Sequence, residues 1–265
     1  MVEVFGYACA ILMGLSLGLI GGGGSILTVP ILVYLFSIDA VLATGYSLFI
    51  VGFTSLIGSF SHIRMGNVHL RTAVVFGIPS ILAVFITRAF IVPAIPQDLF
   101  NIGTLQITKP IALLLLFAVI MLLASYSMIR RKKQKPDYDK VQYNYPLIII
   151  EGFIVGTITG LVGAGGGFLI VPALVLLAHL PMKKAIGSSL LIIATNSLLG
   201  FSVSLFHRDS IDWHLLLTFS AIAILGIIIG SLMSKKISNE KLKPAFGWFV
   251  LIMGIYIILK ETLLK

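Results

Sequence analysis

Near its start the chain reads Gly18-Leu-Ile-Gly-Gly-Gly-Gly-Ser-Ile-Leu-Thr-Val-Pro30, and in its middle it reads Gly160-Leu-Val-Gly-Ala-Gly-Gly-Gly-Phe-Leu-Ile-Val-Pro172. The offset between the two stretches, 172 − 30 = 142 residues, holds without a gap out to Gly58 and Gly200. Glycine destabilises a helix interior. A glycine run that occurs twice, in register and within apolar sequence, therefore indicates a helix that is broken to expose its backbone to a ligand.

Composition places the chain in a membrane. Hydrophobic residues make up 58% of it, charged residues 11%, and the mean hydropathy is +1.08; a soluble domain carries about 25% charged residues. Several apolar segments reach the length of about 20 residues that crosses a bilayer, and the alternating strands of a transmembrane barrel are absent. We expect an all-α polytopic membrane protein with about 8–10 transmembrane helices. The net charge of +9 lies in loops between apolar segments, so it indicates membrane orientation rather than nucleic-acid binding.

The chain divides into two similar halves. Residues 1–129 form a first transmembrane repeat, residues 130–143 a basic cytoplasmic linker, and residues 144–265 a second repeat. Each half contains five apolar segments. They are 4–20, 24–36, 40–61, 71–92 and 109–129 in the first half, and 145–163, 166–179, 184–206, 213–233 and 244–261 in the second.

Loop charges swap between the two halves. In the first half the loop after the third segment is basic and the loop after the second is acidic, whereas the second half reverses this pattern. The charges concerned are Asp39, Arg64 and Arg71 in the first half, and Lys183, Lys184, Arg208, Asp209 and Asp212 in the second. Since positive loops face the cytoplasm, the halves are expected to be inverted-topology repeats.

Opposite orientations require an odd number of membrane crossings in each half. Either all five segments cross, or the first two form a re-entrant hairpin at the glycines and three segments cross. The second segment of the first half has an apolar stretch of about 12 residues, which reaches only about 18 Å as a helix. This length favours a glycine break well inside the bilayer.

The glycine runs are predicted to bind an anion. Helices are expected over residues 25–36 and 168–178, with Pro30 and Pro172 kinking them. Their first N–H groups would lack acceptors near the midplane, where the helix dipole adds positive charge. The candidate substrate-binding residues are Gly22, Gly23, Gly24, Ser25, Gly165, Gly166 and Gly167. The alternative is that the glycines only permit close helix packing.

The third segment of each half supplies polar side chains. Hydroxyls and an amide can donate to an oxyanion without a fixed charge, which keeps release of the anion feasible. The candidates are Thr44, Ser47, Ser188, Ser189 and Asn196. The alternative is that these hydroxyls bond to their own helix or hold helices together.

Few charged or titratable side chains lie in the apolar segments. Glu151 is the candidate for proton coupling, with a position at the cytoplasmic interface as the alternative. Arg88, near the outer end of the fourth segment, is expected to anchor that segment at the membrane interface, with attraction of anions as the alternative. The histidines, among them His62 and His69, are expected in loops without a ligand role. We expect no metal site and no cofactor.

The duplicated glycine motif and its surroundings resemble the sulfite exporter TauE/SafE family, also called the TSUP permeases. The resemblance rests on the paired Gly-Gly-Gly…Val-Pro stretches, on Ala43-Thr-Gly-Tyr-Ser47 and Ala185-Ile-Gly-Ser-Ser189, and on the loop His62…Gly66-Asn-Val68. It covers nearly the whole chain. The chain departs from the usual pattern in its first half, which reads Gly22-Gly-Gly-Ser25 where the second half reads Ala164-Gly-Gly-Gly167.

The resemblance implies a secondary transporter in the bacterial inner membrane that moves sulfite, an organosulfonate or a related anion, with export as the expected direction. Rocking of one repeat against the other would give alternating access to a shared site. The alternative is an anion channel, or a permease for another small oxyanion or a carboxylate. No intramembrane enzyme motif is present, so we expect no enzyme. The expected partners are a small anionic substrate, membrane lipid and a coupling proton or sodium ion, with no nucleic acid; the oligomeric state is left open.

Overall fold

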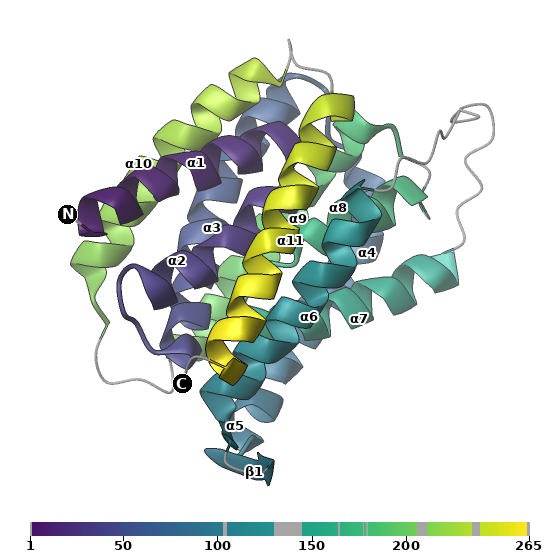
Figure 1. Ribbon diagram of the computed structural model, residues 1–265. Helices are drawn as coiled ribbons and strands as arrows, with labels where there is room; N and C mark the ends of the chain where they lie inside the picture. The colour runs from purple at the N-terminus through teal and green to yellow at the C-terminus, as the bar shows by residue number, and fades with distance from the viewer. Residues whose placement is uncertain are drawn as a thin grey trace.

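The computed structural model describes residues 2–102, 105–129, 145–163, 165–176, 178, 180–205, 211–234 and 239–263 (Figure 1). The basic linker, Ala164, Arg208 and Asp209 lie outside the described residues. In chain order the elements are α1 (Val2–Ile20), the 3₁₀ turn η1 (Gly22–Leu27), α2 (Thr28–Tyr34), α3 (Ala40–Arg64), α4 (Leu70–Ile86), the π-helical turn η2 (Thr87–Ile91), α5 (Val92–Ala94), β1 (Asp98–Ile102), β2 (Leu105–Thr108), α6 (Lys109–Ile129), α7 (Tyr145–Val162), α8 (Gly167–Leu176), α9 (Met182–Leu205), α10 (Trp213–Met233) and α11 (Asn239–Leu263).

Each predicted apolar segment contains a helix, and the fold is mostly helical. Within the described residues, four helices are long and apolar enough to cross a bilayer: Ala40–Arg64, Leu70–Ala94, Met182–Leu205 and Trp213–Met233. Phe5–Ile20, Gly24–Tyr34, Lys109–Leu123 and Pro146–Val162 are shorter apolar helices. The choice between five crossings and a re-entrant hairpin in each half stays a prediction.

The connection between α5 and α6 contains two short strands in addition to the predicted helices. β1 and β2 pair antiparallel, with Phe100 opposite Ile107 and Ile102 opposite Leu105. Apolar residues alternate with polar ones along β2, Leu105-Gln-Ile-Thr108, which is a pattern typical of a strand.

Helices pack across the two halves in matched pairs. α1 packs mainly against α10, and α7 packs mainly against α4. Under the 142-residue offset α1 corresponds to α7 and α10 corresponds to α4, so each of these two pairs is the counterpart of the other. The offset maps the other two principal pairs, α3 with α9 and α6 with α11, onto themselves. Within the last pair, α6 and α11 run in opposite directions side by side (Figure 1).

The pair of α3 and α9, called here the central pair, forms the core. In the most apolar stretch of each of these two helices, 72% of the residues are buried. The corresponding share is 50% in α10 and only 39% in the span Leu70–Ala94, which begins with α4. Large apolar side chains on the outer face of α4, such as Val74, Ile78 and Leu82, are more than half exposed. Such a surface suits contact with lipid, so the polar groups of the central pair are shielded from the bilayer.

The described loop charges separate to opposite ends of the central pair. Loop residue Asn67, between Arg64 and Arg71, lies against Gly187 in the first turns of α9, the helix that begins with Lys183 and Lys184 nearby. These four positive residues therefore lie at one end, called here the basic end. Asp39 caps the start of α3, and the cap of α10, Asp212, is bonded to the first turns of α3. Both aspartates therefore lie at the other end, called here the acidic end.

Candidate functional site

The two glycine runs meet backbone to backbone. η1 packs against α8, and a Cβ atom built on Gly22 would overlap the main chain of Gly167. A Cβ built on Gly167 would likewise overlap the Cα atom of Gly22. Only glycine allows two main chains to approach this closely. The crossing of Gly22 and Gly167 is therefore specified by the residue type at both positions.

The two glycine runs have different backbone conformations. In the second run Gly163, Gly165 and Gly166 have positive φ angles of 76°, 66° and 66°. In the first run the glycine with positive φ is Gly21, at 82°. Positive φ breaks a helix and is readily adopted by glycine, so the expected interruption is present in both halves.

The first short helix opens with a 3₁₀ turn that begins before its predicted start. The sequence predicts a helix from Ser25, but Gly22–Leu27 form the 3₁₀ turn η1 and α2 follows at Thr28. The first N–H groups of such a turn have no acceptor within it, so these donors begin at the glycines themselves. In the second half α8 begins at Gly167, one residue before the expected start.

Each glycine run packs on the central helix of the other half. Gly21, from the first half, faces Ile186 and Ser189 of α9, and the Ser189 hydroxyl would lie 3.0 Å from a Cβ on Gly21. Gly163, the equivalent of Gly21, lies against Thr44 of α3. Thr44 and Ile186 are themselves equivalent under the 142-residue offset. The contacts of the two runs are thus reciprocal.

Gly165 brings the second run between both central helices. A Cβ on Gly165 would lie 2.7 Å from Val51 Cγ1 of α3 and 2.9 Å from Ser197 Oγ of α9. Gly166 instead lies against Thr159 of α7. Among the glycines predicted to bind substrate, Gly165 is therefore the one seen to face a hydroxyl of the central pair.

Several buried hydroxyl groups have no hydrogen-bond partner among the described residues. They include the hydroxyls of four fully buried residues: Thr28 of α2, Ser47 and Ser55 of α3, and Ser197 of α9. Ser55 and Ser197 are equivalent under the 142-residue offset. Most buried polar groups in proteins are bonded, so this set indicates donors and acceptors that a ligand or water can satisfy.

Other predicted hydroxyls bond within their own segment. Ser25 Oγ donates to the Gly22 carbonyl at 2.7 Å, Thr44 Oγ1 to that of Val41 at 2.9 Å, and Ser189 Oγ to that of Ile186 at 2.8 Å. A hydroxyl engaged in this way can still accept a hydrogen bond.

Asn196 joins α9 to α4. Its Nδ2 donates to Ser80 Oγ at 2.6 Å, while its Oδ1 has no partner among the described residues. Asn196 is fully buried, and its place next to Ser197 sets an amide beside the unsatisfied hydroxyl of the central pair.

Two further expectations about polar residues are wrong. Arg88 does not anchor its helix by reaching the protein surface, since its side chain is buried, 4% exposed, in the π-helical turn η2. His62 is not a loop residue but lies in the last turn of α3, 2% exposed and close to Gly187 of α9. Hydropathy alone cannot detect either position, because it does not say which helix face is covered by another helix.

Glu151 lies apart from the glycine runs. It is half-buried on α7, eleven residues before the end of that helix at Val162. At 1.5 Å per residue the separation is about 16 Å. Its role in coupling therefore stays a prediction, and no group of three metal-ligating side chains occurs among the described residues.

Two matched hydrogen bonds close the ends of the central pair. The hydroxyl oxygen of Tyr46 accepts the N–H of Asp212 at 2.8 Å, and Ser188 Oγ accepts the N–H of His69 at 2.8 Å. Tyr46 and Ser188 are equivalent under the offset, and Asp212 and His69 cap α10 and α4. We call these bonds the Tyr46 latch, at the acidic end, and the Ser188 latch, at the basic end.

The surroundings of the two latches differ. At the acidic end Phe49, Phe201 and Trp213 pack edge to face, with the ring centroids of Phe49 and Phe201 4.9 Å apart. At the basic end burial lowers the pKa of His69 below its ordinary value of 6.5, and the charges of Lys184 and Arg71 lower it further. The neutral ring is thereby favoured, which suits the cap because Nδ1 accepts the N–H of Thr72.

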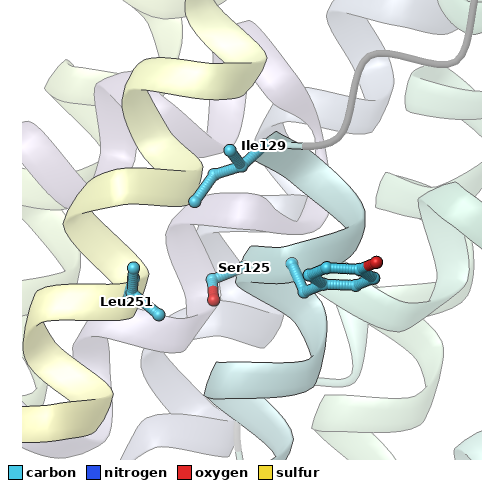
Figure 2. Close-up of a pocket in the computed structure, with 4 residues that line it drawn as sticks. Ser125, Ile129 and Leu251 are labelled. Carbon is cyan, nitrogen blue, oxygen red and sulfur yellow. The ribbon is translucent and has the colours of Figure 1, made fainter.

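A cavity of about 440 Å³ lies between α6 and α11, away from the glycine runs. Figure 2 shows Ser125 and Ile129 of α6 facing Leu251 of α11 across it. Its lining is almost wholly apolar, and the Ser125 hydroxyl already donates to the Leu122 carbonyl at 2.7 Å. No predicted site residue lies on these two helices, so this cavity is separate from the candidate site.

Comparisons with known proteins match the chain along nearly its full length. Residues 7–257 fit the family model described as "Sulfite exporter TauE/SafE". A "Probable membrane transporter protein" of Xylella fastidiosa (strain 9a5c) is 32% identical over 253 residues, covering 93% of this chain and 91% of the relative. The "Probable membrane transporter protein YunE" of Bacillus subtilis (strain 168) is 29% identical over 273 residues, covering 96% and 95%. No solved structure matches the chain significantly.

Proposed function

The chain belongs to the sulfite exporter TauE/SafE family and is a multi-pass membrane transporter, and we propose that it moves a small sulfur-containing anion, sulfite or an organosulfonate. In this proposal it is a secondary transporter of the bacterial inner membrane that exports its substrate by alternating access. A proton or sodium ion drives the movement, with Glu151 as the coupling carboxylate.

The observation that carries the proposal is the crossing of Gly22 and Gly167 beside unsatisfied hydroxyls. Interrupted backbone at membrane depth is tolerated where it is covered by protein or lines a substrate path. Here the two interruptions lie against each other and against the central pair, where Ser197 lies beside Gly165. Backbone N–H groups and hydroxyls can together donate to the oxygens of a sulfite or sulfonate group.

The pairing of helices supports inverted repeats. α1 with α10 corresponds to α7 with α4, and the central pair maps onto itself. Such self-pairing is what a two-fold relation between halves produces. The basic end gathers charges from loops that do not match between the halves: Arg64 and Arg71 follow the third segment of the first half, and Lys183 and Lys184 follow the second segment of the second half. This distribution also supports an inverted arrangement.

The two latches support alternating access. Each joins one end of the central pair to the capping residue of a peripheral helix, α10 or α4. Opening the Tyr46 latch frees α10 at the acidic end, and opening the Ser188 latch frees α4 at the basic end. Each bond contributes only about 1 kcal/mol, so breaking the latch itself adds little to the cost of opening that end.

Flux measurements on the purified protein in liposomes test the proposal. Sulfite, sulfoacetate, taurine and sulfate are supplied with and without a proton or sodium gradient, and acetate is the carboxylate comparison. We expect at least one sulfur-containing anion to accumulate against its own gradient when an ion gradient is present. Movement only down its gradient would instead indicate a channel, and movement of acetate alone a carboxylate permease.

A further inference from the structure

We propose that Arg88 is the charged group of the anion site and that it binds the substrate oxygens together with Thr44. This inference rests on the proposed function, since it assigns the residue that recognises the negative charge of the substrate. The Arg88 side chain is 4% exposed, and its Nη1 donates to Thr44 Oγ1 at 3.2 Å. The guanidinium group therefore points into the protein, toward α3, rather than toward solvent or lipid headgroups.

Thr44 connects Arg88 to the second glycine run. A Cβ built on Gly163 would lie 2.5 Å from Thr44 Cβ, and Gly163 has the positive φ angle of an interrupted helix. One side chain thus contacts both the guanidinium group and the turning backbone. An anion that reaches the glycine run at this point would meet a fixed positive charge.

The backbone around Arg88 is unusual in a way that turns the side chain inward. Thr87–Ile91 form a π-helical turn, and the N–H of Val92 bonds to the Thr87 carbonyl five residues earlier. π-Turns are rare and are often found at functional sites, because the extra residue changes which face of the helix the following side chains occupy. Thr87, next to Arg88, is also fully buried, and its Oγ1 has no partner among the described residues.

The chemistry of guanidinium suits a sulfite or sulfonate group. Its planar fork of N–H donors binds two oxygens of one oxyanion at once. A buried charge within a membrane protein is costly and marks functional sites by default. The Thr44 hydroxyl accepts one of the donors and so helps to orient the guanidinium group.

The charge is confined to one half of the molecule. The residue equivalent to Arg88 under the 142-residue offset is Gly230, which packs against the backbone of Leu15 in α1. Thr44 is the fifth residue of α3, so the guanidinium group lies about 6 Å, or one turn, from the acidic end. The candidate site at Arg88 is therefore placed toward the acidic end.

Variants of Arg88 test this assignment in the liposome assay and in a binding assay. Arg88→Gln removes the charge, Arg88→Lys keeps the charge but not the fork, and Arg64→Gln removes an exposed charge at the basic end as the matched control. Apparent affinity for the transported anion and its stabilisation of the purified protein against heat are measured for each. We expect Arg88→Gln to weaken affinity about 10- to 100-fold, Arg88→Lys to weaken it less, and Arg64→Gln to stay within about twofold of wild type.

The outcomes separate this inference from the proposed function. Wild-type affinity in Arg88→Gln would overturn the role of Arg88 while leaving transport of a sulfur-containing anion intact. A lower melting temperature with unchanged anion affinity would show that Arg88 only supports the fold. If Arg88→Gln does not insert stably, Arg88→Lys and Thr44→Val decide, since both preserve side-chain volume approximately. Absence of sulfur-anion flux in the wild type would instead refute the proposed function itself.

Discussion

Replacing Gly22 with alanine adds one methyl group at the point where the two halves cross. That Cβ would lie less than 3.0 Å from main-chain atoms of Gly167. Real Cβ atoms essentially never approach other heavy atoms so closely. Carbon atoms pack best at about 3.5–4.0 Å, so the two main chains must separate by at least about 1 Å. Because the obstacle is backbone and not a flexible side chain, we expect a cost near the upper end of the range for overpacking, about 3 kcal/mol.

Heat denaturation and liposome flux measure this effect. A loss of about 3 kcal/mol corresponds to a fall of roughly 6–12 °C in the apparent melting temperature of a protein of this size. The shift of the glycine runs is expected to reduce the initial rate of transport at least about tenfold, because displacements near 1 Å disrupt a binding geometry.

Gly77→Ala is the matched control. Gly77 is also buried, but the nearest atom to its added Cβ would be Ile192 Cγ1 at 4.0 Å. Alanine favours the helix there by up to about 1 kcal/mol, so stability should be unchanged or slightly higher and flux normal. Wild-type melting temperature and flux in Gly22→Ala would show that the two glycine runs do not touch in the working transporter.

Two further predictions concern the ends of the central pair. Tyr46→Phe and Ser188→Ala each remove the acceptor of one latch, and we expect them to shift the labelling of cysteines placed at the two ends in opposite directions; shifts in the same direction would contradict alternating access. Because the pKa of His69 is lowered in the folded protein, its contribution to stability is present above about pH 6.5, the ordinary value, and is lost as the pH falls below that value. His69→Asn keeps a capping oxygen that does not titrate, so its melting temperature should fall less than that of the wild type between pH 7.5 and pH 5.5, and an equal fall in both proteins would exclude this role for His69.

Hydropathy is sufficient to locate the helices of this chain. Each apolar segment predicted from the sequence contains a helix, because the bilayer requires apolar runs with bonded backbones. The pairing of helices across halves does not follow from hydropathy, since apolar faces alone do not specify their partners. The reciprocal contacts of Gly21 with Ile186 and of Gly163 with Thr44 are likewise not specified by the duplicated motif, which indicates two similar halves but does not place one against the other.

Arg88 and His62 show why polar positions are harder to predict. A regular helix spacing places Arg88 near the end of a long apolar segment, where arginine ordinarily reaches the membrane interface. The π-helical turn from Thr87 changes that spacing, and no feature of the sequence indicates it. His62 lies in the last turn of α3, and it is buried because the start of α9, from the other half, covers it.

The crossing also accounts for the point at which the two motifs differ. The first reads Gly22-Gly-Gly-Ser25 and the second Ala164-Gly-Gly-Gly167. The crossing joins Gly22 to Gly167, which are not equivalent positions under the offset. Serine is accommodated at position 25, where its hydroxyl donates to the Gly22 carbonyl, but any side chain at position 167 would meet Gly22. Each half therefore has glycine at the position where it crosses the other, Gly22 in the first and Gly167 in the second. Gly22→Ala makes the first motif more similar to the second, which has Ala164 at the equivalent position, and we still expect it to push the two halves apart.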